Sequence, residues 1–179
     1  MPAPMPAPWN TDAIAIHTQR LLNSFLRCTD RSLLPPESAP SVSTVEFLQS
    51  QAQQLFEAPF VVVSHGIQAD PIFNYGNRKA LELWELSWDE LTQMPSRKTA
   101  EVEFQGARSQ MLAEALHKGY IDYYEGIRIS STGRRFRILD GIIWNVVDET
   151  VVNEASDALE LSEAYCWGQA AMFSRYEFL

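Results

Sequence analysis

The chain has 179 residues, a formal charge of −9, 46% hydrophobic residues and two cysteines. This length and apolar content suit one folded domain with an appendage. No apolar run reaches the roughly 18 residues that a membrane span needs, so we expect no membrane insertion. A surface of net negative charge repels phosphate backbones, which argues against nucleic-acid binding by this chain alone.

The N-terminus and the cysteines indicate a cytoplasmic protein. The opening MPAPMPAPWN lacks the basic start and the apolar region of a secretory signal. Cys28 and Cys166 lie far apart and form no CxxC pattern. We therefore expect neither a disulfide framework nor a thiolate metal site.

The first 58 residues predict a disordered tail followed by a helical extension. Residues 1–10 are rich in proline and small residues, a composition that cannot bury enough apolar surface to order itself. Residues 11–28 place their apolar side chains on one helical face, and a second helix begins at the capping box Ser43–Glu46. This extension, residues 11–58, either covers a sheet of its own chain or pairs with another subunit.

Residues 59–179 predict a sheet domain. Short β-forming runs at 60–63 and 72–75 form a first hairpin. Short helices follow at 78–86 and 87–94, the second of which opens with a capping box. A longer helix then runs from Phe104 to a glycine stop at Gly119.

The central hairpin spans residues 120–147, and a last strand is expected at 165–176. Apolar side chains alternate on both sides of the small polar turn at 130–133, which is typical of a sheet with one covered face. Between the hairpin and the last strand lies an acidic insertion, 148–163, with six acids and no base. The order of elements contains no βαβ alternation, so it predicts an α+β fold: a five-stranded antiparallel sheet with helices on one face.

Several segments resemble one known family. HG…DPIFNYGNRKALELWELSWDEL, PSRKTAE, GYIDYYEGIRISSTGRRFRI, WN and GQAAMFSRY, in this order over residues 43–176, resemble the MEKHLA domain, which is related to PAS domains. The resemblance implies a PAS-like fold and a sensory role in light or redox signalling. The acidic insertion departs from the short turn that the family has at this place.

The resemblance also implies where a ligand would bind, because PAS domains bind ligands between the concave face of the sheet and the helices. Polar residues that could face this space are Asn74, Tyr75, Asn77, Arg97, Arg128, Arg135, Arg137, Asn145 and Gln169. The ligand-binding residues that we expect are Asn74, Tyr75, Arg97, Tyr123, Ile129, Phe136, Trp144 and Gln169. Which face of the hairpin lines the pocket depends on its register, since a slip of one residue exchanges the faces.

The sequence names no cofactor. A photoactive flavin module needs a cysteine early in its helical region, and neither cysteine lies there. His117 lies where haem-binding PAS modules use a histidine, but an exposed histidine near the helix C-terminus is the favoured interpretation. The three histidines lie on different elements without metal-ligand spacing.

Three functions remain open at this point. The first is a PAS-like sensory or interaction module that binds a small organic ligand or a protein partner without catalysis. The second is a ligand-free dimerisation or docking module. The third is a small isomerase or hydrolase, for which Asp70, Asp122 and Asp140 are candidate acids, although no catalytic motif is present. For the first two we expect a homodimer through residues 11–57 and the outer face of the sheet.

Overall fold

The computed structural model describes residues 7–36, 44–148 and 166–179. The helices are α1 (Asp12–Thr29), α2 (Thr44–Phe56), α3 (Arg78–Trp84), α4 (Trp88–Leu91), the 3-10 helix η1 (Ser96–Thr99) and α5 (Val102–Lys118). The strands are β1 (Val61–His65), β2 (Phe73–Gly76), β3 (Tyr120–Ile129), β4 (Arg135–Val147), β5 (Cys166–Phe173) and β6 (Arg175–Phe178). The expected cap at Ser43, residues 1–6 of the tail and nearly all of the acidic insertion lie outside the described residues, whereas residues 7–10 form a turn in which the N–H of Asn10 donates to the carbonyl of Ala7.

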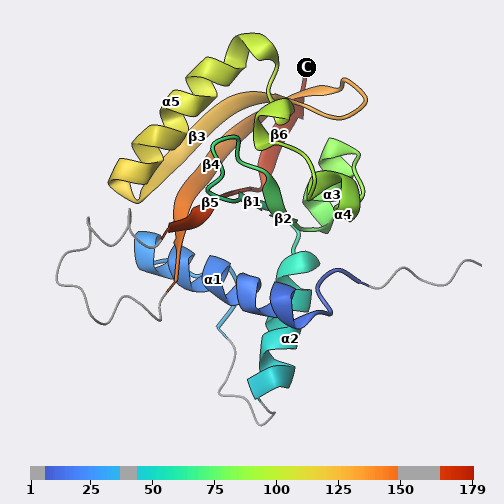
Figure 1. Ribbon diagram of the computed structural model, residues 1–179, viewed down its shortest axis with the longest axis vertical. Helices are drawn as coiled ribbons and strands as arrows, with labels where there is room; N and C mark the ends of the chain where they lie inside the picture. The colour runs from blue at the N-terminus through green and yellow to red at the C-terminus, as the bar shows by residue number, and fades with distance from the viewer. Residues whose placement is uncertain (1–6, 37–43, 149–165) are drawn as a thin grey trace, which may run out of the picture.

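The strands form one antiparallel sheet in the order β2-β1-β5-β4-β3, as expected for an α+β fold of this type (Figure 1). A short sixth strand, β6, also pairs with β4. β5 and β6 keep one register along β4, because Ile142 faces Met172 and Leu139 faces Arg175. The last strand predicted at 165–176 is therefore a long strand interrupted at Ser174.

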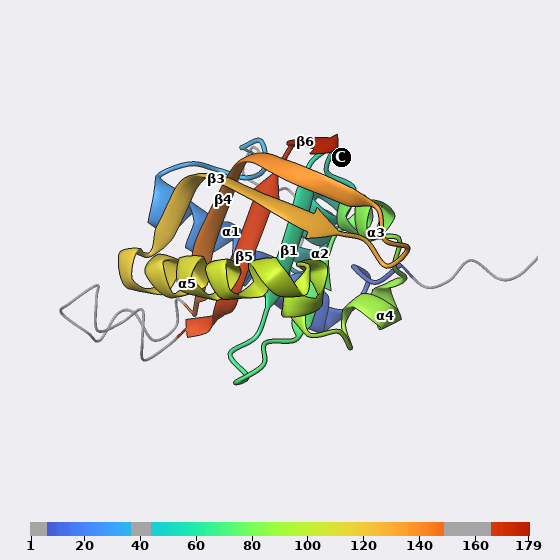
Figure 2. The same cartoon turned by 90° about the horizontal axis from the view of Figure 1, so that it is seen from above.

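Helices cover both faces of the sheet, with α5 in front of it and α1 behind it in Figure 2. The inner face, towards α3 and α5, buries a cluster that includes Val63, Phe73, Trp84, Phe136 and Ile138. The outer face, towards α1, buries a second cluster that includes Leu21, Phe25, Val62, Trp144 and Val146. The helical extension thus covers the sheet of its own chain, which is the first of the two alternatives.

Polar contacts attach α1 to this outer face. His17 lies 2.9 Å from the Ser64 hydroxyl on β1, and that hydroxyl donates to Asn74 at 2.5 Å. Ser24 both donates to the carbonyl of Val147 and accepts from its backbone N–H, as a neighbouring strand would. The outer face of the sheet is therefore occupied within the chain, so it is not available as the homodimer interface expected from the sequence.

Two compensating bulges determine which side chains of the central hairpin point to the inner face and which to the outer face. Between Ile121 and Tyr124, β3 carries one extra residue relative to β4, and β4 carries one extra residue between Ile138 and Gly141. Tyr123 and Asp140, at these places, have positive φ angles of 54° and 52°. Each bulge exchanges the two faces of its strand.

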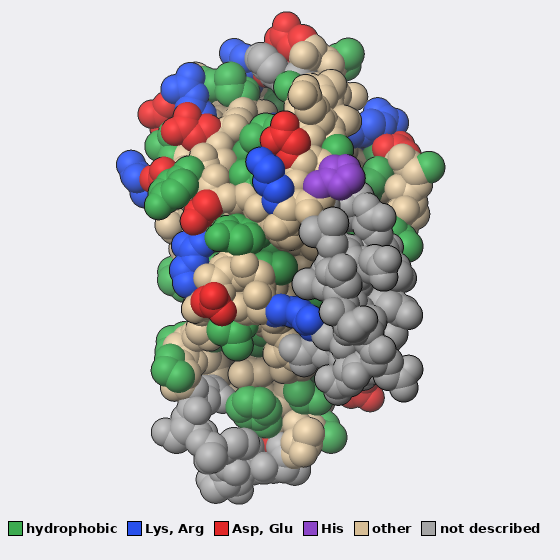
Figure 3. All heavy atoms as spheres, turned by 90° about the vertical axis from the view of Figure 1, so that its left-hand side faces the viewer, with side chains coloured by type: hydrophobic (Ala, Val, Ile, Leu, Met, Phe, Trp, Pro, Cys, Tyr) green, Lys and Arg blue, Asp and Glu red, His purple; other side chains and the backbone are tan. Residues whose placement is uncertain are grey.

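Several charged side chains on the surface form ion pairs within the chain. In Figure 3 basic and acidic side chains lie next to one another over the visible face. Arg135 pairs with Glu101 and Arg137 with Glu177, so these two hairpin arginines point away from the inner face, as the alternation predicts. In the described part of the chain, none of the helices is both long enough and apolar enough to span a bilayer.

Candidate ligand cavity

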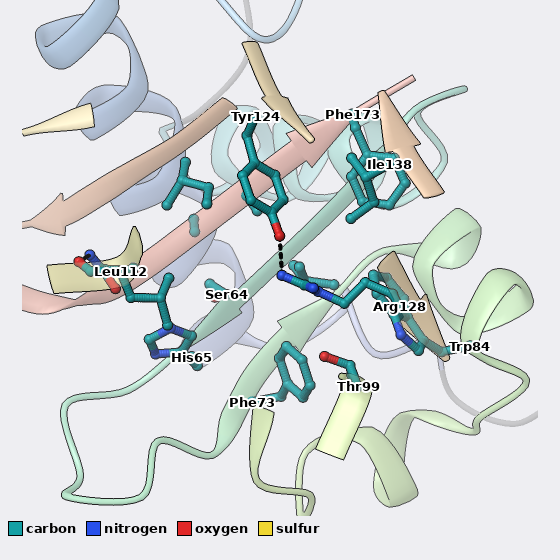
Figure 4. A pocket seen from close by; sticks show the side chains of 15 residues that line it. Ser64, His65, Phe73, Trp84, Thr99, Leu112, Tyr124, Arg128, Ile138 and Phe173 are labelled. Atoms are coloured by element: carbon teal, nitrogen blue, oxygen red, sulfur yellow. Dashed lines mark hydrogen bonds between the residues drawn. The ribbon is translucent and has the colours of Figure 1, made fainter. Parts of the chain in front are cut away.

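A cavity of about 50 Å³ lies between the inner face of the sheet and the helices that cover it. β1, β5, β4 and β3 form its floor, and α3, η1 and α5 contribute the opposite wall (Figure 4). Its lining residues are Val63, Ser64, His65, Phe73, Trp84, Thr99, Leu112, Tyr124, Arg128, Ile138, Ile143, Gln169, Ala170, Ala171 and Phe173. Most of this surface is apolar, with a few polar groups, as is usual for small-molecule sites.

Arg128 and Tyr124 provide the main polar group of the cavity. Figure 4 shows the guanidinium of Arg128 reaching across the space towards the hydroxyl of Tyr124, to which it donates a hydrogen bond. A second N–H of Arg128 donates to the carbonyl of Ile127 at 2.7 Å. Gly126, between them on the same face, makes this contact sterically feasible, since a Cβ there would lie 2.1 Å from the Tyr124 hydroxyl oxygen.

The polar groups at the β1–β5 end of the cavity are fixed by the fold. The Gln169 amide donates to the carbonyl of Leu112 on α5 at 2.7 Å and to Asn145 at 3.2 Å. His65 Nδ1 lies 2.9 Å from the carbonyl of Gly66, so it carries the proton and donates. The bond from Gln169 to Leu112 ties α5 to the sheet at this end of the cavity.

Of the ligand-binding residues expected from the sequence, Gln169 lines the cavity and Phe136 lies near it. Phe136 packs edge-on against Trp84 in the inner cluster, with ring centroids 5.4 Å apart. Tyr75 and Trp144 lie on the other face, in the cluster under α1. Asn74 lies at a bulge of β2 and accepts from Ser64, next to α1.

The remaining three expected residues lie away from the cavity. Arg97 forms an exposed ion pair with Asp70, at 3.0 Å between side-chain atoms. Tyr123 is 78% exposed at the bulge of β3. Ile129 follows Arg128 along β3 and points to the opposite face, because successive side chains of a strand alternate.

Arg128 is among the polar candidates from the sequence but not among the expected ligand-binding residues, and Tyr124 and Trp84 are in neither set. Strict alternation from Tyr123 places Ile127 and Ile129 inward, whereas the bulge turns Tyr124, Gly126 and Arg128 inward. A usable signal is the spacing Tyr124-x-Gly126-x-Arg128. It places a phenol, a space and a guanidinium on one face of one strand.

The described residues offer the cavity no acid and no cysteine. Asp70, Asp122 and Asp140 each form an exposed ion pair with an arginine. Cys28 and Cys166 do not line the cavity. Across the described ranges, no group of three or more histidine, cysteine or acidic side chains is arranged to hold a metal ion.

Comparison with known proteins supports the expected family and fold. The model of the MEKHLA domain matches residues 15–178. No curated protein sequence matches the chain.

Among solved structures, the chain is similar to the PAS domain of a protein from Colwellia psychrerythraea, with 12% identity and a TM-score of 0.56. That match covers 74% of this chain and 97% of the other. It is also similar to an RNA-binding light-oxygen-voltage receptor, with 13% identity and a TM-score of 0.53, over 83% of this chain and 36% of the receptor. At these identities the similarity shows a PAS-like fold.

Proposed function

The chain belongs to the MEKHLA domain family, and on this premise we propose that it is a PAS-like sensory module that binds a small organic ligand in the cavity beside Arg128, without catalysis. The PAS-like fold supports a ligand site between sheet and helices, and the cavity lies there. The volume of about 50 Å³ is well below the roughly 300 Å³ of the smallest usual ligand pockets, so it suits a ligand of a few heavy atoms rather than a flavin or haem.

The cavity itself is the observation that carries this proposal. Protein cores are close-packed, and voids larger than a water molecule are few. Here such a void coincides with buried hydrogen-bonding groups on Arg128, Tyr124 and Trp84. A docking module with a filled core does not require such a cavity. An isomerase of the expected kind requires a carboxylate in the cavity, and none of the described lining residues carries one.

Ser64 supports a route from the cavity to the surface. It contributes to the cavity lining, and its hydroxyl lies 2.9 Å from His17 on α1. A ligand that moves β1 would therefore change the contact that attaches α1 to the sheet. We propose α1 as the element that transmits ligand binding to a partner.

A substitution that fills the cavity tests the ligand site. Ala171 lines the cavity from β5, so Ala171→Leu should occupy its space and abolish binding. Ala113→Leu, on the exposed side of α5, is the matched control and should bind as the wild type does. Native mass spectrometry of freshly purified protein, with an absorption spectrum, measures the bound ligand directly.

Two outcomes would count against the proposed site. A ligand that is retained equally by Ala171→Leu binds elsewhere on the molecule. Wild-type protein that carries no ligand, and whose stability no small molecule changes, favours the ligand-free docking module instead.

The homodimer also remains a proposal, with its interface moved. α1 occupies the outer face of the sheet, so a second copy would contact the solvent side of α1 and α2. Apolar side chains are exposed there, including Ile16, Leu26 and Val45. A ligand-induced shift of α1 would therefore alter this interface directly.

A further inference from the structure

Arg128 is a buried arginine without an acidic partner. Its residue surface is 7% exposed. Its partners are the carbonyl of Ile127 and the phenol of Tyr124, and no carboxylate of the described residues pairs with it. Burial lowers the pKa of Arg128 below its ordinary value, but an arginine stays protonated in proteins. The cavity wall therefore carries an uncompensated positive charge.

Other arginines of the same hairpin do not share this feature. Each forms a surface ion pair: Arg134 with Glu85, Arg135 with Glu101 and Arg137 with Glu177. Exposed arginines can rely on water, whereas a buried charge needs a partner of opposite sign. The unpartnered arginine is thus the one that faces the cavity, where a ligand can supply that partner.

Two further hydrogen-bond donors belong to the same wall. The indole N–H of Trp84 is buried and has no acceptor among the described residues. The hydroxyl of Tyr124 accepts from Arg128, so its own hydrogen remains available to donate. Figure 4 shows Arg128 between these two side chains. A ligand that satisfies this wall needs acceptors and a negative charge.

The rest of the cavity determines which chemical group the ligand carries beside its negative charge. Phe73, Ile138 and Phe173 present apolar surface, and the volume of about 50 Å³ limits the ligand to a few heavy atoms. Building on the ligand-sensing function proposed above, we propose that the cavity binds a short-chain monocarboxylate. Arg128 and Tyr124 hold its carboxylate, and its alkyl chain lies against the apolar wall.

Calorimetric titration of the full chain with sodium acetate, propionate and butyrate tests this assignment. The neutral propionamide has the shape of propionate without its charge, and sodium chloride supplies an inorganic anion. We expect saturable binding of at least one carboxylate with one site per chain. We expect propionamide and chloride to bind at least about tenfold more weakly, because charge-assisted bidentate bonds require the carboxylate.

Variants assign the binding to the named side chains. Arg128→Gln should weaken carboxylate binding at least about tenfold, and Tyr124→Phe, which keeps the ring, about fivefold. Arg137→Gln removes a surface arginine of the same strand pair and should leave binding unchanged. Without ligand, Arg128→Gln should unfold at the same or a higher urea concentration than the wild type, since it removes an uncompensated charge. A purely structural arginine would give the opposite shift.

The outcomes separate this inference from the function on which it rests. Equal binding of propionamide and propionate, with both lost in Ala171→Leu, would overturn the carboxylate assignment and leave a ligand sensor. Equal binding of chloride would reduce the site to an inorganic anion site. Carboxylate affinity unchanged in both Arg128→Gln and Tyr124→Phe would also overturn it. Absence of any small-molecule binding by the wild type would overturn both proposals.

Discussion

His17 joins α1 to the sheet through a chain of defined donors. Ser64 donates its hydroxyl hydrogen to Asn74, so the hydrogen between His17 and Ser64 belongs to His17 Nε2. Burial, with a smaller contribution from the charge of Arg20, lowers the pKa of His17 to about 4, and the hydrogen bond with Asn74 opposes this shift. His17 is therefore neutral in the folded protein at neutral pH.

This lowered pKa makes stability depend on pH in one direction. Above about pH 6.5 both the folded and the unfolded chain hold neutral His17. Between about pH 6.5 and about pH 4 the unfolded chain binds a proton that the folded chain does not, so the free energy of unfolding falls as pH falls. The full loss from this residue is about 3 kcal/mol.

His17→Gln should remove that part of the pH dependence, because a glutamine can donate to Ser64 but does not titrate. The urea midpoints of variant and wild type, compared at about pH 7.5 and about pH 4.5, measure it. The wild type should lose more stability across this window than the variant. Parallel pH curves would mean that His17 is already protonated or exposed in the folded chain.

Asn77 shows which features of a single residue can be predicted from the sequence and which cannot. The cap at Asn77 was predicted from its residue type, and the side chain accepts from the N–H of Ala80 as expected. It also accepts from Val62 and donates to the carbonyls of Leu55 and Phe60, which joins α2, β1 and α3. Local sequence predicts the cap, but it cannot reveal these distant partners.

At the scale of elements, α1 packs as a layer on the outer face of the sheet. Leu21 is fully buried in the outer cluster, and Phe25 packs edge-on against Trp144 with ring centroids 4.9 Å apart. The amphipathic pattern of residues 11–28 predicts this helix correctly. The pattern cannot say which surface receives its apolar face, because one sheet face and a second subunit offer similar chemistry.

Truncation of one side chain on each face of α1 measures this packing. Leu21→Ala should lower the free energy of unfolding by about 2–5 kcal/mol, because it leaves a cavity under the helix. Leu26→Ala, at a position that is 50% exposed, should change it by less than about 0.5 kcal/mol. Urea denaturation at low protein concentration compares them. Equal, small effects would mean that α1 does not pack on the sheet in solution.

The bulges explain why the two strands of the hairpin could be predicted from the sequence, whereas the side chains that point inward could not all be predicted. Alternation from Phe136 correctly places Phe136 and Ile138 inward. Beyond Asp140 both faces of the strand carry apolar side chains, with Asn145 as the exception, so apolar alternation does not signal that Ile143 has replaced Trp144 as the inward residue. A bulge of one residue leaves composition unchanged and inverts every position after it.

At the scale of the whole molecule, the fold class was predicted because the order of elements permits few topologies. The absence of βαβ units excluded a parallel sheet, and the family resemblance specified a PAS-like arrangement. The cavity could not be predicted in the same way. Its lining comes from strands and helices between residues 63 and 173, and its existence depends on how tightly these layers pack.

The proposed homodimer is a property of the whole molecule as well. Sedimentation equilibrium at about tens of micromolar should show a dimer, since that is a range where a weak interface is populated. Leu26→Glu should shift the molecule towards monomer by placing a charge on the proposed interface. Val102→Glu makes the same kind of change on exposed α5 and should not. A wild-type monomer at this concentration would contradict the proposal.

Each of the two covered faces of the sheet buries one of the five tryptophans of the chain. Trp84 is buried in the inner cluster and lines the cavity, whereas Trp144 is buried in the outer cluster against α1. Light emitted by Trp84 would therefore respond to whatever enters the cavity, and light emitted by Trp144 to the seating of the helix. With the other three tryptophans replaced, and Trp84 and Trp144 observed one at a time, their emission would show in real time whether an event on one side of the sheet reaches the other.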